Sequence, residues 1–197
     1  MQAKSNEDDP ELNNICYRCG SSNVLFTLFH ANRSHERCTN CGHPFVRCFI
    51  NFDVLPLVEF FVDENLSLDN ICQLLHESSY EQKKDGSLGE DEFDRIINDS
   101  LQTQVKPGSY KPITIASESL RSMNSQQVFV CKPLLPGEPV KLYKNMIPEI
   151  AIVLSPCCNL FFHAEDFEFA CLRDECCPFS RKKINYNSGS YNVEAEQ

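Results

Sequence analysis

Two five-residue stretches of the same form decide the fold at the start of this 197-residue chain: Cys16-Tyr17-Arg18-Cys19-Gly20 and Cys38-Thr39-Asn40-Cys41-Gly42. Two residues between paired cysteines let both sulfurs reach one metal ion, and two such pairs complete a tetrahedral shell of four thiolates. The glycine after each pair suits a turn that requires a positive φ angle. We therefore predict a zinc ribbon over residues 15–50, in which one Zn²⁺ ion is bound by Cys16, Cys19, Cys38 and Cys41.

The 12 cysteines of the chain either form disulfides or bind metal, and the compartment decides between the two. The first ten residues contain no basic stretch followed by an apolar one, so no secretory signal is readable. This favours reduced thiols. A pair of disulfides, or unligated core cysteines, is the alternative. A redox-active Cys-x-x-Cys pair is disfavoured because it needs a single exposed pair on a βαβ unit.

A ribbon of this length cannot bury enough apolar surface to fold unaided. Zinc must therefore supply much of its stability, on the order of 10 kcal/mol in small zinc modules. His30, His35 and His43 lie in or beside the ribbon. Because four cysteines already complete the shell, we expect these histidines to be surface or packing residues.

A second group of cysteines lies near the C-terminus with less regular spacing. Cys158, His163 and Cys177 are candidate ligands of a second zinc ion, with Cys157, Cys176 or water as the fourth ligand. A site with an open position is able to catalyse hydrolysis, but no His-Glu-x-x-His helix accompanies it. The alternative is a small core filled by cysteine and phenylalanine.

Residues 51–78 are predicted to form a helical hairpin. Its first helix is capped by Asp53, and Ser67 caps the second. The apolar face of the first helix consists of Leu55, Val58, Phe61 and Val62.

Residues 79–109 are predicted to form an acidic, flexible linker, because Glu, Asp, Lys, Ser and Gly dominate this stretch. Four apolar residues within it have helical spacing: Phe93, Ile96, Ile97 and Leu101. We therefore expect a short amphipathic segment there that docks onto a partner.

Residues 110–182 read as a β-rich region that ends in the degenerate second ribbon, with strands expected over 112–115, 128–131 and 150–154. The termini, 1–14 and 183–197, are polar and expected to be disordered. The predicted fold class is α+β, with small zinc-ribbon modules at both ends of a helical hairpin and a short-stranded β region.

Composition excludes several classes of function. The chain has 18 Lys and Arg against 28 Asp and Glu, a formal net charge of −10, which argues against nucleic acid as the main partner. No apolar run approaches the roughly 18 residues that insertion into a bilayer requires. No catalytic triad, phosphate-binding loop or paired-carboxylate motif is present, so we do not expect an enzyme.

Several motifs occur in a fixed order along the chain: Cys16-Tyr17-Arg18-Cys19, the Cys38/Cys41 pair followed by Pro44-Phe45, the stretch 53–60, Leu120-Arg121-Ser122-Met123, Cys158 to Phe162-His163, Glu165-Asp166 and Cys176-Cys177-Pro178. In this order they resemble the C-terminal region of the intraflagellar transport protein 122 family, a subunit of complex A. The resemblance implies a non-enzymatic assembly module that acts in retrograde ciliary transport and in localising ciliary proteins. It also implies other complex A subunits as partners, indirect contact with membrane-protein cargo, and a place on the cytoplasmic side of the cilium and ciliary base.

The chain departs from the family pattern in two respects. In the family the second site reads Cys-Pro-x-Cys, Phe-His and Cys-Pro-x-Cys, whereas two of those cysteines fall here on Ser155 and Ser180. Family-style ligation carries over to Cys158 and Cys177, with His163 as a further candidate. Family members also carry N-terminal WD-repeat propellers and a helical-repeat arm, so we expect this chain to correspond to part of a longer protein.

Two other functions fit some of the same features. A RING-type ubiquitin-ligase module also uses Cys and His sites, but its ligand pairs are interleaved, and here 115 residues separate Cys41 from Cys157. A nucleic-acid-binding ribbon is the second, because the segment 16–50 carries four arginines and one glutamate.

Overall fold

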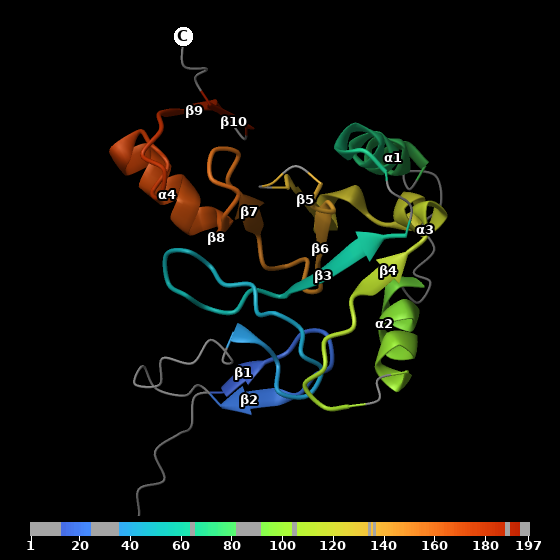
Figure 1. Cartoon of the computed structure of the whole chain (residues 1–197). Helices are drawn as coiled ribbons and strands as arrows, with labels where there is room; N and C mark the ends of the chain where they lie inside the picture. Colours follow the sequence, from blue (N-terminus) through green and yellow to red (C-terminus); the bar gives the residue numbers. More distant parts are fainter. Residues whose placement is uncertain are drawn as a thin grey trace, which may run out of the picture.

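The computed structural model describes residues 13–24, 36–63, 66–81, 92–103, 106–133, 135, 137–187 and 190–193. A four-stranded sheet lies at the centre, and two small ribbon-like units flank it (Figure 1). The N-terminal unit contains the hairpin of β1 (Asn13–Ile15) and β2 (Ser22–Val24), and the C-terminal unit contains helix α4 (Ala164–Asp174). The predicted α+β class is confirmed.

The central sheet has the strand order β4-β3-β6-β5. Its members are β3 (Leu57–Val62), β4 (Ile113–Ile115), β5 (Val128–Cys131) and β6 (Lys141–Asn145). Strand β4 pairs parallel to β3, and the other neighbours pair antiparallel. The expected strands at 112–115 and 128–131 are therefore present, whereas β6 was missed because Lys141, Tyr143 and Lys144 hide its apolar positions.

Helices cover one face of this sheet. They are α1 (Leu68–Glu81), α2 (Glu92–Gln102) and the short α3 (Ser117–Ser122), which is followed by a 3₁₀ turn at Ser125–Gln127. Alternate sheet residues meet them in one core that includes Val58, Phe60, Ile71, Leu75, Phe93, Ile97, Ile113, Ile115, Leu120 and Leu142. None of the described helices has the length and apolar character needed to cross a membrane.

The opposite face of the sheet packs against the C-terminal unit. Leu57 of β3 and Cys131 of β5 contact Cys48 and Phe161 in a second apolar cluster. Phe161 belongs to β8 (Phe161–His163), which pairs antiparallel with β7 (Ile152–Leu154). Residues 57–60 of β3 are therefore buried on both faces of the sheet.

The predicted helical hairpin over 51–78 is wrong in its first half, because residues 57–62 form strand β3. A six-residue apolar run does not distinguish a buried strand from a buried helix by periodicity. A central strand covered on both faces has such a run, because both sets of alternating side chains are buried. The second half is confirmed: α1 forms, and the Ser67 hydroxyl accepts a hydrogen bond from the backbone N–H of Asn70 at 3.3 Å.

The predicted linker over 79–109 contains helix α2, which packs on the chain's own core instead of on a partner. Phe93 and Ile97 are buried, and the Phe93 ring lies 5.0 Å from that of Phe60. The Glu92 carboxylate accepts hydrogen bonds from the hydroxyls of Ser119 and Ser122, which ties α2 to α3. The prediction of an amphipathic helix was therefore correct. The polar composition of residues 79–109 led to the wrong prediction that this helix lies in a flexible linker.

The parts of the two termini that the structure describes form strands, so the expectation of disorder is wrong for those residues. Residues 1–12 lie outside the described part, but Asn13 and Asn14 pair with β2. At the other end, β9 (Ile184–Asn187) and β10 (Ser190–Val193) form an antiparallel hairpin. Ile184 is buried in the core of the C-terminal unit, so one apolar residue anchors a polar segment.

We expect Phe93→Ala to lower the free energy of unfolding by about 3 to 5 kcal/mol, because it leaves a cavity between α2 and the sheet. Phe169→Ala on α4 is the control, since that ring is 66% exposed; its effect should stay within about 0.5 kcal/mol. Urea denaturation of the zinc-loaded chain measures both. Equal effects of the two changes would contradict the docking of α2.

Candidate metal centre

Each predicted cysteine pair lies in its own six-residue backbone turn, and the two turns have the same form, which we call a knuckle turn. Its first residue accepts a hydrogen bond from the N–H of the fifth and donates its own N–H to the carbonyl of the sixth. In the first turn, Gly20 N–H donates to Cys16 over 2.8 Å; in the second, Gly42 N–H donates to Cys38 over 2.9 Å. Both glycines have positive φ angles, 70° and 67°, as the spacing predicted.

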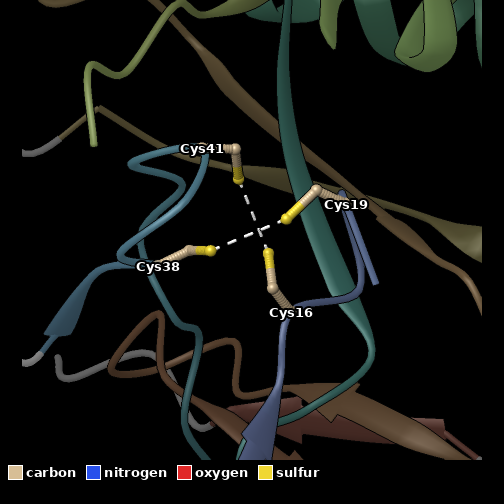
Figure 2. A group of neighbouring side chains, drawn as sticks. All are labelled: Cys16, Cys19, Cys38 and Cys41. Carbon is tan, nitrogen blue, oxygen red and sulfur yellow. Dashed lines mark hydrogen bonds between the residues drawn. The ribbon is translucent and has the colours of Figure 1, made fainter. Parts of the chain in front are cut away.

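The two knuckle turns face each other, and their first and fourth residues supply the four sulfurs (Figure 2). The Sγ atoms of Cys16 and Cys41 are 3.6 Å apart, as are those of Cys19 and Cys38. All four sulfurs lie within 4.8 Å of one another, and three of the four residues are buried. This arrangement fits a tetrahedral Zn²⁺ with four thiolate ligands and no open position.

Hydrogen bonds prepare these thiols for a cation. The Cys41 thiol donates to Cys16, and this contact lowers the pKa of Cys16 while raising that of Cys41. Burial raises the pKa of Cys38. Hydrogen bonds from the Ser21 hydroxyl and from backbone N–H groups lower the pKa by more than burial raises it, so the net shift is downward. Because metals bind the thiolate form, the lowered pKa values of Cys16 and Cys38 favour ion binding, whereas Cys41 loses its proton when the ion binds.

Asparagine side chains form the next layer around the sulfurs. The amide of Asn40 donates to Cys19 Sγ and that of Asn23 donates to Cys38 Sγ, each over 3.6 Å. The side-chain oxygen of Asn23 also accepts from the backbone N–H of Thr39 at 2.8 Å. Asn23 thus joins β2 to the second knuckle turn and holds the two turns in register.

His43 connects the metal centre to the central sheet. It is 2% exposed and lies outside the four-sulfur group, as expected for a packing histidine. Its Nε2 accepts a hydrogen bond from the backbone N–H of Glu59 in β3 at 2.9 Å, and its side chain also lowers the pKa of Cys16 by hydrogen bonding. His30 and His35 lie outside the described residues.

Arg18 connects the first knuckle turn to helix α2. Its guanidinium donates to the Ser100 hydroxyl at 3.2 Å and lies 5.6 Å from the centre of the Tyr110 ring. Arg18 is only 3% exposed, so it is not available to a phosphate backbone. This weakens the nucleic-acid interpretation, which counted Arg18 among four arginines of the ribbon.

Some of the predicted second-site residues lie close together in space, but they do not form a group like that of the four N-terminal cysteines. Cys158 Sγ and Cys177 Sγ are 3.8 Å apart, and Cys157 Sγ lies 3.4 Å from the Ser155 hydroxyl. His163 ends β8, and Cys176 forms an isolated antiparallel bridge with Lys183. Within the described residues, the first four cysteines are the one group of three or more potential ligands whose donor atoms lie within 4.8 Å.

A further knuckle turn, which the sequence did not predict, lies at residues 48–53. Phe52 N–H donates to the Cys48 carbonyl over 3.0 Å, and Cys48 N–H donates to Asp53 over 2.9 Å. Phe52 has a φ angle of 60°. A Cys-x-x-Cys-Gly pattern is absent here, so no sequence signal indicated the turn.

Comparison with known proteins gives a family match in the C-terminal unit and relatives along nearly the whole chain. Residues 150–187 match the family model described as "IFT122, C-terminal zinc ribbon domain". Along 94% of its length the chain is 28% identical to the intraflagellar transport protein 122 homolog of Danio rerio, and along 92% it is 28% identical to that of Homo sapiens. The homolog of Mus musculus is 26% identical over 94% of the chain.

The chain spans about one sixth of the length of these relatives, 16% to 17%. The resemblance inferred from the ordered motifs is thereby confirmed. Zinc is the metal that the four-thiol group and the matched family both indicate.

The two knuckle glycines provide a matched pair of mutations. Gly20→Ala meets nothing within 4 Å of its new Cβ, so we expect it to cost about 1 kcal/mol, for the positive φ alone. At Gly42 a Cβ would lie 2.6 Å from the backbone N of Tyr110 and 2.7 Å from the Gly108 carbonyl oxygen. Gly42→Ala should therefore cost about 3 kcal/mol or more.

Thermal unfolding and competition with a zinc chelator measure the difference between the two glycine variants. Gly42→Ala should release zinc at lower chelator concentration than Gly20→Ala. Equal zinc retention by both variants would show that the loop at 106–110 does not press against the second knuckle turn.

Proposed function

We propose that this chain is a non-enzymatic assembly module of intraflagellar transport complex A, in which a zinc-stabilised surface docks onto other subunits. The observation that carries the proposal is the closed four-thiol site joined rigidly to the sheet, in a chain similar to intraflagellar transport protein 122 homologs over nearly all its length. A four-thiolate shell leaves no position for substrate, so such a metal supports structure and not catalysis.

The docking surface we propose is a groove of about 700 Å³ between the two ribbon units and the sheet. Its lining includes four basic residues, Arg37, Arg47, Lys132 and Lys141, and two acidic ones, Glu59 and Glu138. The surrounding protein carries a formal net charge of −10. The groove is therefore a local basic surface on an acidic protein, and its charge complements an acidic segment of a partner subunit.

The acidic residue at the base of this groove is already partnered. The Glu59 carboxylate accepts hydrogen bonds from the hydroxyls of Tyr110 at 2.7 Å and Tyr143 at 3.0 Å, and Lys141 lies 3.4 Å away. Burial and the nearby carboxylate raise the pKa of both tyrosines, so their hydroxyls stay protonated as donors. Glu59 thus stabilises the groove wall, and the basic side chains at the rim set its charge.

The resemblance supplies the biological setting of the proposal. Within complex A the module would act in retrograde ciliary transport and in localising ciliary proteins, at the cilium and the ciliary base. Contact with membrane-protein cargo would be indirect, through other subunits. Zinc matters in this setting because a rigid ribbon presents its part of the groove without an ordering cost on binding.

Two charge-matched double variants test the proposal. Arg37→Glu with Lys132→Glu reverses two charges in the groove, and Lys106→Glu with Lys111→Glu reverses two exposed charges that do not line it. We expect the groove variant to bind co-expressed complex A subunits roughly tenfold more weakly, about 1.4 kcal/mol, and the control to bind as the wild type does.

Co-purification followed by affinity measurement at two salt concentrations gives the outcome. If the wild-type chain retains no complex A subunit, the assembly role is wrong. If it binds but the groove variant binds equally well, only the assignment of the groove is wrong.

A further inference from the structure

The knuckle turn occurs five times in the described residues, with first residues Cys16, Cys38, Cys48, Ser155 and Cys177. In each, the fifth residue has a φ angle between 59° and 70° and donates its N–H to the first residue over 2.8 to 3.0 Å. In each, the residues flanking the turn pair antiparallel. The C-terminal ribbon is thus built from the same two backbone turns as the N-terminal one.

This equivalence identifies the ligand positions of the C-terminal ribbon, because the first and fourth residues of each turn point at the metal in the N-terminal ribbon. The corresponding residues are Ser155 and Cys158 in one turn, and Cys177 and Ser180 in the other. The 3.8 Å separation of Cys158 and Cys177 matches the 3.6 Å separation of Cys19 and Cys38 at the same two positions. The two turns therefore face each other, with hydroxyls in place of two thiols.

Such a donor set does not fit zinc. Structural zinc sites use thiolate, imidazole and carboxylate ligands, and a serine hydroxyl is not among them. The Ser155 hydroxyl is instead in contact with the sulfurs of Cys157, at 3.4 Å, and Cys177, at 3.6 Å. The Ser180 hydroxyl is buried beside Cys177.

The three other candidate ligands do not complete the set. Cys157 is the third residue of its turn, Cys176 precedes the first residue of the facing turn and pairs with Lys183, and His163 ends β8. None of them joins Cys158 and Cys177 in a group within 4.8 Å in the part of the chain that the structure describes.

Apolar packing accounts for the order of the C-terminal ribbon. Phe162 and Phe167 are fully buried beside Cys171, Cys177 and Ile184. The ring of Phe49 lies 5.7 Å from that of Phe162 and 4.9 Å from that of Phe179, so the knuckle turn at 48–53 packs against this unit. That turn has one cysteine, at Cys48, which belongs to no group of three or more potential ligands within the described residues, so the same backbone turn also occurs outside a candidate metal site.

We propose that the C-terminal ribbon of this chain folds without a metal ion, so that the chain binds one zinc ion and not two, although the matched family model is named for a zinc ribbon. Aromatic packing replaces the ion as the source of stability, and the serines at two ligand positions remove the site. The groove proposed for docking therefore has one wall, the N-terminal ribbon, that depends on metal and another, the C-terminal ribbon, that does not.

Zinc content per chain tests this directly, measured on purified full chains by elemental analysis. We expect one equivalent in the wild type, one in Cys158→Ser and none in Cys16→Ser. Ser155→Cys combined with Ser180→Cys should raise the content to two equivalents, because it restores four sulfurs to facing turns. A wild type with two equivalents, or a restored variant that stays at one, would overturn the proposal.

Hydrogen exchange of the wild type tests the same proposal without a mutation, so its result does not depend on whether a variant folds. On adding a zinc chelator, amides of residues 13–24 and 36–44 should lose protection, whereas those of β7, β8 and α4 should keep theirs. Loss of protection in β7 and β8 together with the first ribbon, at the same chelator concentration, would refute a metal-free C-terminal ribbon.

Discussion

A six-residue turn closed by two backbone hydrogen bonds is the constraint on which this structure depends. It demands a positive φ angle at its fifth residue and brings the first and fourth side chains to the same side. Where two turns face each other and carry four thiols, repulsion among buried thiolates must be offset by a cation. In the N-terminal ribbon, zinc is thus the consequence of the backbone geometry together with the cysteines.

The metal centre is joined to the rest of the molecule through a few polar side chains. His43 accepts from the backbone of β3, and Arg18 reaches the hydroxyl of Ser100 on α2 while lying over Tyr110. Tyr110 in turn donates to the carboxylate of Glu59, the β3 residue whose backbone N–H donates to His43. Because these contacts meet at Glu59, which also lines the groove, order in the ribbon and the shape of the groove are coupled.

The two ribbons show that one backbone motif accepts two sources of stability. The N-terminal ribbon has a core made mostly of cysteine sulfurs, with the partly buried Phe45 and Leu101 packed against them, so little apolar contact remains to hold it when the ion is absent. The C-terminal ribbon surrounds Cys177 with aromatic rings. The glycines at the fifth position of the first two turns avoid the strain that Phe52, Asn159 and Arg181 carry in the other three.

The sequence by itself determined the first metal site, because two Cys-x-x-Cys-Gly stretches fix the ligands, the turn and the sign of φ within five residues each. It also determined α1 and the amphipathic pattern of α2. Only the tertiary structure decided that 57–62 is a central strand, that α2 covers the chain's own core, and that residues 48–53 and 155–160 form the same turn as the two Cys-x-x-Cys-Gly stretches. The physical reason is that burial on two sheet faces and aromatic packing arise between segments distant in the chain, and no local spacing records them.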